Sequence, residues 1–108
     1  MKTIKSKTEF EKVFVQGKRA NRPTIKVRVL RSQGDPGRVA FVAPKRLGNA
    51  VFRNRCKRVL REAARICELP REGMSTILFA TPQTKDTKPA DVALDLRKAL
   101  VRLGIDDG

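Results

Sequence analysis

Residues 49–67 read NAVFRNRCKRVLREAARIC. Apolar side chains recur in this stretch at intervals of three and four residues, which predicts an amphipathic α-helix from about Ala50 to Cys67. Asn49 is expected to cap it, because an Asn side chain can accept a hydrogen bond from an amide of the first turn. The apolar stripe consists of Phe52, Cys56, Val59, Leu60, Ala63, Ile66 and Cys67. Such a stripe has to be buried, so we expect the core to form against this helix.

The face opposite the apolar stripe is cationic. It carries Arg53, Asn54, Lys57, Arg58, Arg61 and Arg65, with Arg55 nearer the boundary. Surface helices usually mix charges of both signs, which gives favourable pairs one turn apart. From Lys45 to Arg61, however, there are seven basic residues and no acidic one. This pattern favours an anion-binding face over one that is merely solvated.

The start of this helix contains an electrostatic conflict. Arg53 and Arg55 fall in its first two turns, where the positive end of the helix macrodipole disfavours a cation by ~0.3–1 kcal/mol. The last predicted helix has the favourable arrangement, with Asp91 early and Arg102 late. An anion bound at the start of the cationic helix would remove the conflict, because helix amides and arginines together form a phosphate site.

The charge of the whole chain supports a polyanionic partner. Its 108 residues suit a single domain, residues 1–108, and carry a net charge of +14. From Lys12 to Arg61 there are 15 basic residues and one acidic residue, whereas the remainder of the chain is nearly neutral. Nucleic acid is the first candidate partner and an anionic membrane surface the second. No apolar run approaches the roughly 20 residues of a spanning helix, and no apolar segment follows the basic N-terminus, so we expect a cytoplasmic protein without membrane attachment.

The residue types argue against side-chain catalysis. The chain has no histidine, which removes the commonest general base and the commonest metal ligand. Cys56 and Cys67 would lie about 16 Å apart along one helix, too far for a disulfide, and are expected in the core. The sequence therefore predicts no catalytic residue and no metal site.

The rest of the chain predicts a mixed order of helices and strands. Ser6 and Glu9 fit a capping box at the start of a helix that ends at Gly17. The predicted strands are 24–30 and 38–43, joined as a hairpin through a turn at 33–37, a buried strand at 75–80, and a short extra strand near 18–21. A final helix is predicted over about 90–103. The order is α-β-β-(β)-α-β-α, of the α+β class.

A second candidate surface combines aromatic and cationic side chains. Phe10 and Phe14 lie one turn apart on the first helix, and Lys26 and Arg28 share one face of a strand. Rings beside cations suit single-stranded nucleic acid, whose bases stack and whose phosphates pair. Two Phe residues at this spacing are also typical of a core-facing helix, and the residues alone leave both interpretations open.

The segment from Lys45 to Glu62, KRLGNAVFRNRCKRVLRE, resembles the signature of the protein subunit of bacterial ribonuclease P. Glu9 to Phe14, followed by Gly17, is similar to the first helix of that family. The resemblance implies a two-layer α+β sandwich like domain 2 of ribosomal protein S5, with a left-handed βαβ crossover. It also implies a ribonucleoprotein that removes the 5′ leader of precursor tRNA, with hydrolysis carried out by the RNA subunit and Mg²⁺ held mainly by RNA.

The resemblance also implies roles for two sets of residues. The set expected to bind ribonuclease P RNA is Lys45, Arg46, Asn49, Arg53, Asn54, Arg55, Lys57, Arg58 and Arg61. The set expected to line a cleft for the leader of precursor tRNA is Phe10, Phe14, Lys26 and Arg28. Members of the family often have an aromatic residue on the strand after the first helix, and here that strand reads Lys26-Val27-Arg28. A phosphate contact by Lys26 or Arg28 is the expected substitute.

Two alternatives remain at this stage. A basic structural RNA-binding protein, such as a ribosomal or assembly factor, shares the charge pattern and the lack of catalytic groups but needs no leader recognition. A metal-dependent nuclease acting alone needs paired carboxylates. Asp91 and Asp95 are the only pair one turn apart in a predicted helix, and we interpret them as a solvated face.

Overall fold

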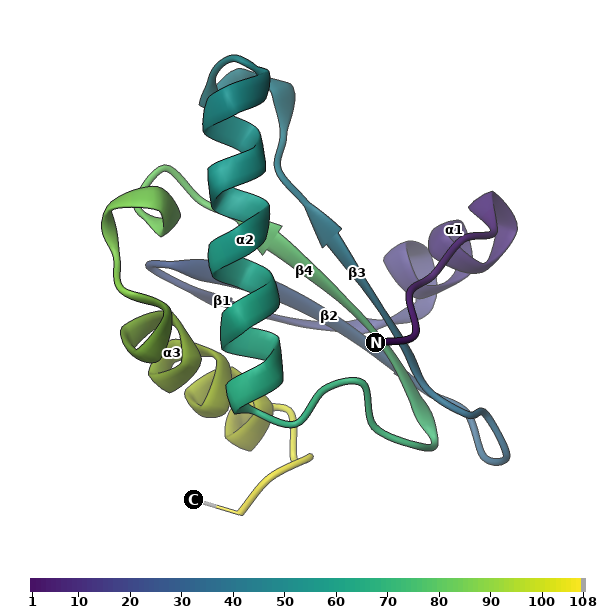
Figure 1. The fold of residues 1–108 in the computed structure, drawn as a ribbon. Coiled ribbons are helices and arrows are strands. Elements are labelled where there is room, and N and C mark those ends of the chain that lie inside the picture. Colours follow the sequence, from purple (N-terminus) through teal and green to yellow (C-terminus); the bar gives the residue numbers. More distant parts are fainter. Residues whose placement is uncertain (108) are drawn as a thin grey trace.

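The computed structural model describes residues 1–107, and within them three helices pack against one four-stranded sheet (Figure 1). The helices are α1 (Lys7–Gln16), α2 (Ala50–Ile66) and α3 (Pro89–Arg102). The strands are β1 (Lys18–Arg22), β2 (Ile25–Arg31), β3 (Arg38–Val42) and β4 (Met74–Ala80), and two single turns of 3₁₀ helix are η1 (Lys45–Leu47) and η2 (Thr84–Asp86). The α+β class and the predicted element order, including the extra short strand, are confirmed.

The strand order β1-β2-β4-β3 makes the predicted hairpin between β2 and β3 wrong. β4 lies between them, antiparallel to β2 and parallel to β3. β4 is apolar and covered on both faces, which suits a central strand. The turn at 33–37 instead packs on the chain entering β4: Ser32 donates to the Gly73 carbonyl at 2.9 Å, and Gly73 donates to the Asp35 carbonyl at 2.7 Å. β2 forms its hairpin with β1.

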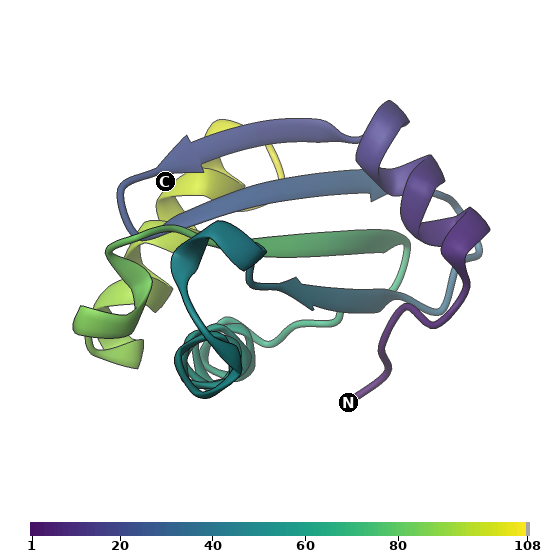
Figure 2. The ribbon, with the colours of Figure 1, turned by 90° about the horizontal axis from the view of Figure 1, so that it is seen from above.

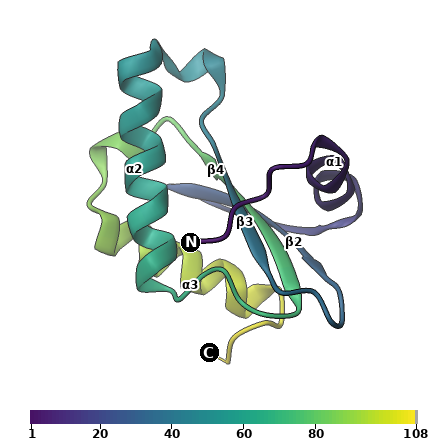
Figure 3. The ribbon, with the colours of Figure 1, turned by 45° about the vertical axis from the view of Figure 1, so that its right-hand side comes forward.

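Helices cover both faces of this sheet. Figure 3 shows α2 and α3 on one side and α1 on the other, and Figure 2 shows the strands side by side with α2 seen end-on. Followed from β3 through α2 into β4, the connection is left-handed (Figures 1 and 3). This crossover, expected from the family resemblance, departs from the right-handed rule for parallel strands. It positions the start of α2 directly beyond the end of β3.

The helix α2 is capped and docked as its sequence predicts. The Asn49 side chain accepts a hydrogen bond from the Phe52 amide at 3.0 Å. Cys56, Leu60 and Ala63 are fully buried in the main core. The predicted apolar stripe differs at one edge, where Ala64 is buried and Ile66 is partly exposed, because α3 covers that side of α2.

A smaller core joins α1 to the opposite face of the sheet. It is built on Val13, Ala40 and Ile77. Ser6 caps α1, its hydroxyl accepting from the Glu9 amide at 3.3 Å. The reciprocal half of the predicted capping box is not formed, because the Glu9 carboxylate pairs with Arg38 at 3.0 Å instead. α1 is thus tied to β3 by an ion pair as well as by apolar contacts.

Gly17 ends α1 for a steric reason. Its amide donates to the Val13 carbonyl at 2.8 Å, and a Cβ at this position would lie 2.4 Å from that same oxygen. The Val29 carbonyl approaches from the other side at 3.1 Å. Only glycine fits between helix and strand, so the predicted stop at Gly17 is confirmed.

Asp95 is a structural residue, and its interpretation as part of a solvated face is wrong. Its carboxylate accepts from the Thr24 amide at 3.1 Å and from the Thr24 hydroxyl at 2.7 Å, and it pairs with Arg22. Burial raises the pKa of this carboxyl, but the hydrogen bonds from Thr24 and Arg22 outweigh burial and hold the pKa below its usual value. Asp95 therefore fastens α3 to the β1–β2 turn, whereas Asp91 is exposed.

The Asp95→Asn variant tests this anchor. Near pH 7 we expect it to lose about 1–3 kcal/mol of unfolding free energy, because charged hydrogen bonds are lost. The folded-state pKa is lowered, so the wild-type advantage is present above the unfolded-state value and disappears as pH falls below about 4. Denaturant unfolding at a series of pH values measures this difference. Asp91→Asn on the same helix is the control, and a difference independent of pH for Asp95→Asn would contradict the assignment.

Candidate nucleic-acid interface

The cationic face of α2 lies open and without acidic partners. Arg55, Arg58 and Arg61 are exposed, and Arg53 and Lys57 are half-buried. Within residues 1–107, none of the seven basic side chains between positions 45 and 61 forms an ion pair, although Arg65 pairs with Glu62. Five of these cations thus lie on α2, and the described part of the protein leaves the charge of all seven unneutralised.

The first turns of α2 contain a buried donor that lacks an acceptor. The Arg53 Nε–H group is enclosed and makes no hydrogen bond to any described residue. A buried donor in this condition costs about 1–3 kcal/mol. The Asn49 side chain already accepts a hydrogen bond from the Phe52 amide, and it is not an acceptor for the Arg53 Nε–H group. An anion at this end of α2 would be attracted by the Arg53 guanidinium and would offset the unfavourable dipole.

Aromatic rings hold two of the basic side chains in place. The Arg61 guanidinium lies 5.2 Å from the centre of the Phe41 ring of β3. The Lys85 ammonium of η2 lies 4.0 Å from the centre of the Phe52 ring, so η2 adds a cation beside the start of α2 that the sequence pattern did not indicate.

Beneath this surface Cys56 and Cys67 are free and buried, and burial raises the pKa of both thiols. They are core residues, as predicted.

The second predicted surface forms a groove between α1 and the sheet. Its volume is about 280 Å³, and its lining includes three of the four predicted residues, Phe14, Lys26 and Arg28. The other lining residues are Asn21, Val42, Pro44, Arg46, Phe79 and Ala80. No acidic side chain belongs to this set. The groove combines aromatic rings with positive charge, as single-stranded nucleic acid requires.

Phe10 and Phe14 differ in how far they are exposed. Their rings stack at 6.3 Å between centres with 18° between planes. Phe10 is half-buried against the smaller core, whereas Phe14 is 40% exposed and lines the groove. Phe10 therefore packs toward the core, as the core-facing interpretation predicts, whereas the ring of Phe14 is accessible at the groove.

The side chain of Arg28 contacts Phe14 in two ways. Its guanidinium lies 4.3 Å from the centre of the Phe14 ring, and its Nη1 donates a hydrogen bond to the Phe14 carbonyl. Lys26 is exposed and forms no ion pair within the described part of the chain. Of the two cations expected on β2, Lys26 is thus the one free to contact a phosphate.

Phe79 is a groove residue that the sequence did not reveal. Its ring meets Phe14 edge-on at 5.9 Å between centres, with 67° between planes. It lies opposite Lys26 in the β2–β4 register. Alternation along β4 separates Ile77 and Phe79 from Leu78 and Ala80, but both sets are apolar. Only the pairing of β4 with β2 shows which set faces α1.

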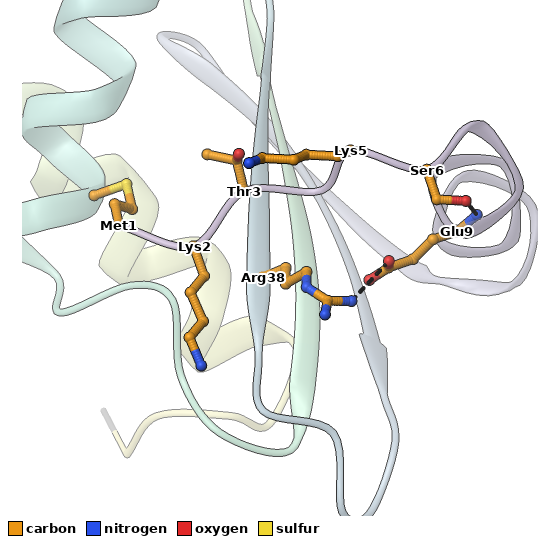
Figure 4. Close-up of a pocket in the computed structure, with 7 residues that line it drawn as sticks. All are labelled: Met1, Lys2, Thr3, Lys5, Ser6, Glu9 and Arg38. Carbon is orange, nitrogen blue, oxygen red and sulfur yellow. Dashed lines mark hydrogen bonds and ion pairs between the residues drawn. The ribbon is translucent and has the colours of Figure 1, made fainter.

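A larger cavity, of about 550 Å³, lies beside the N-terminal segment (Figure 4). Residues 2–4 run along the outer edge of β3, with Ile4 donating to the Val39 carbonyl at 3.0 Å. Arg38 points to Glu9 and pairs with it, while Lys2 and Lys5 extend in different directions. The charged side chains of this cavity do not converge on one point, so we place the candidate interface on α2 and the α1 groove.

Comparisons with known proteins identify the family of this chain. The family model described as Ribonuclease P matches residues 1–104. The ribonuclease P protein component of Gluconacetobacter diazotrophicus is 36% identical over 105 residues, covering 94% of this chain and 90% of the relative. That of Symbiobacterium thermophilum is 37% identical over 105 residues, with the same coverage of 94% and 90%.

Solved structures show the same fold. The RNase P protein of Staphylococcus aureus superposes with a TM-score of 0.76 at 23% identity, covering 97% of each chain. That of Thermotoga maritima superposes with a TM-score of 0.73 at 19% identity, covering 91% of this chain and 94% of the other.

Within residues 1–107, none of the helices combines the length and apolar character needed to cross a bilayer.

Sulfate binding tests the anion site at the start of α2. At equal ionic strength, we expect sulfate to raise the wild-type Tm by a few degrees more than chloride does, because an anion bound to the folded state stabilises it. Arg53→Ala combined with Arg55→Ala should remove this excess. Lys98→Ala combined with Arg102→Ala, on exposed positions of α3, should retain it, which separates site binding from general salt exclusion. Equal behaviour of the two double variants in thermal unfolding would argue against the site.

Proposed function

This chain belongs to the ribonuclease P protein family, and on that premise we propose that it binds the RNA subunit through α2 and holds the 5′ leader of precursor tRNA in the α1 groove. The protein component that defines this family is part of a tRNA-processing ribonuclease. The observation that carries the proposal is the segment of η1 and α2 between positions 45 and 61, where seven basic residues, five of them on α2, have no acidic partner among the described residues. Phosphates of a structured RNA are the partner that matches this charge.

The binding residues on α2 follow from its burial. Leu60 and Ala63 fix one side of the helix in the core, so Arg55, Arg58 and Arg61 are exposed, and Arg53 and Lys57 are half-buried. The proposed set for the RNA subunit is Lys45, Asn49, Arg53, Asn54, Arg55, Lys57, Arg58 and Arg61; Arg46, which the family resemblance places with them, lines the α1 groove. Of these, Asn49 acts indirectly, because its side chain caps the helix.

The groove supports a role in holding the leader. Phe14 offers a partly exposed ring on which a base can stack, and Lys26 offers an unpaired ammonium for a phosphate. Arg28 keeps Phe14 in position from one side, and Phe10 supports it from α1. We assign Phe14 and Lys26 to direct contact, and Phe10 and Arg28 to support of the contact surface.

In this proposal the RNA subunit carries out the hydrolysis and holds the Mg²⁺ that hydrolysis requires. Carboxylates on α1, α2 and α3 already have protein partners: Glu9 pairs with Arg38, Glu62 pairs with Arg65, and Asp95 binds Thr24 and Arg22. No group of three or more potential metal-ligating side chains occurs in residues 1–107. The side chains of this protein bind and orient RNA, and no step of the chemistry is assigned to them.

A comparison of substrates with and without a leader tests the groove. With a bacterial ribonuclease P RNA bound, we expect the wild type to bind precursor tRNA more tightly than leaderless tRNA. Phe14→Ala should weaken binding of the precursor by roughly 5- to 150-fold, the range for one base stacked on an aromatic ring. Val15→Ala, at an exposed position of the same helix, is the control. Equal wild-type affinity for both substrates would favour a basic structural RNA-binding protein without leader recognition.

Salt dependence tests the α2 surface separately. Each neutralised phosphate contributes about −0.7 to −0.9 to the slope of log K against log salt concentration. Arg53→Ala combined with Arg55→Ala should therefore flatten the slope for RNA-subunit binding by about 1.4–1.8, and should reduce cleavage at low Mg²⁺. The Lys98→Ala and Arg102→Ala pair should leave the slope unchanged. A slope that the α2 variants do not alter would mean that this face is only solvated.

A further inference from the structure

Arg46 lies where the two proposed surfaces meet. It belongs to η1, the single turn between the end of β3 and the start of α2 (Figure 1). Its side chain lines the α1 groove together with Phe14 and Lys26. The sequence places Arg46 with the α2 cations, because it is followed closely by that helix. Its position in the structure joins it to the groove instead.

The turn that presents Arg46 is held in place on both sides. Leu47 packs against the main core, and its amide donates to the Pro44 carbonyl at 3.0 Å. The Gly48 amide donates to the Lys45 carbonyl at 3.2 Å. Adjacent residues of one turn thus have different surroundings: Leu47 is in the core, and Arg46 is on the groove wall. Lys45, which is also exposed, is not part of the groove lining.

The charges in the groove leave Arg46 without a protein partner. Arg28 is engaged by the ring and the carbonyl of Phe14. Lys26 and Arg46 form no ion pair or side-chain hydrogen bond within the described chain, and the groove lining contains no acid. Two uncompensated cations, one on β2 and one on η1, therefore border the same groove beside Phe14. A phosphodiester is the group that would satisfy both while a neighbouring base meets the ring.

We propose that Arg46 is a leader-binding residue, which contacts a phosphate of the leader strand at the end of the groove nearest α2. This inference rests on the proposed function and assigns Arg46 to a different RNA from Lys45. The leader leaves the RNA-bound side of the protein at η1 and passes Arg46 before it reaches Phe14 and the supporting Phe10. A short leader therefore meets Arg46 first, and a longer one adds the aromatic contact.

The matched pair Arg46→Ala and Lys45→Ala tests the assignment in the reconstituted holoenzyme. Dissociation constants are measured for tRNA without a leader and for precursors whose leaders grow one nucleotide at a time. Arg46→Ala should weaken binding of leader-bearing substrates by about 10-fold or more, the effect of one charge-assisted contact, and leave leaderless tRNA unaffected. The loss of affinity caused by Arg46→Ala should appear at shorter leaders than the loss caused by Phe14→Ala. The salt slope should fall by about 0.7, and only when a leader is present.

Lys45→Ala should instead weaken assembly with the RNA subunit, with the same consequence for every leader length. Arg46→Gln keeps the length of the side chain, and its Tm confirms that an effect on binding is not a loss of folding. If Arg46→Ala and Arg46→Gln weaken substrate binding equally with and without a leader, this assignment is overturned and Arg46 belongs to the α2 surface. A wild type that does not distinguish the two substrates would overturn the proposed leader groove itself, and Arg46 as a leader residue with it.

Discussion

The burial of one side of α2 is the constraint on which the other features depend. Leu60, Ala63 and Ala64 bring the helix onto the sheet, and burying one large aliphatic side chain contributes about 1.5–3 kcal/mol. The cost of arginines near the positive end of the helix is smaller, ~0.3–1 kcal/mol for each. Packing therefore outweighs the electrostatic conflict, and the folded protein can keep a row of cations that form no ion pair with the described residues. The charge of that row is available to a partner because no acidic side chain of the described chain neutralises it.

The central position of β4 has a second consequence. Because β4 lies beside β3 and α2 covers one face of the sheet, the β3-α2-β4 connection is a left-handed crossover, and the opposite face is left to α1. One face of the sheet thus anchors the cationic helix, and the other forms the floor of the groove. The two surfaces come together only at η1, immediately after β3 ends. Two different surfaces are in this way built on the two faces of one sheet.

Local features of the fold could be predicted from the sequence, and long-range pairing could not. The helical period and the Asn49 cap define α2 because both depend on neighbours within one or two turns. The hairpin between β2 and β3 was wrong because a turn-rich stretch shows that the chain reverses, but not that a later strand inserts. For the same reason the partner of Glu9 was missed: the local capping box competes with Arg38, which is 29 residues away. Asp95 has its partners 71 and 73 residues away.

The aromatic residue missing from β2 shows how structure completes what the sequence suggested. Along the chain, Lys26-Val27-Arg28 offers no ring beside Phe14. Across the sheet, β4 supplies one, because Phe79 pairs in register with Lys26 and meets Phe14 edge-on. Arg28 covers the ring of Phe14 rather than facing a phosphate, and this leaves Lys26 and Arg46 as the free cations of the groove. The elements of an aromatic and basic groove are therefore all present, but they come from α1, β2, β4 and η1, and only the strand order brings them together.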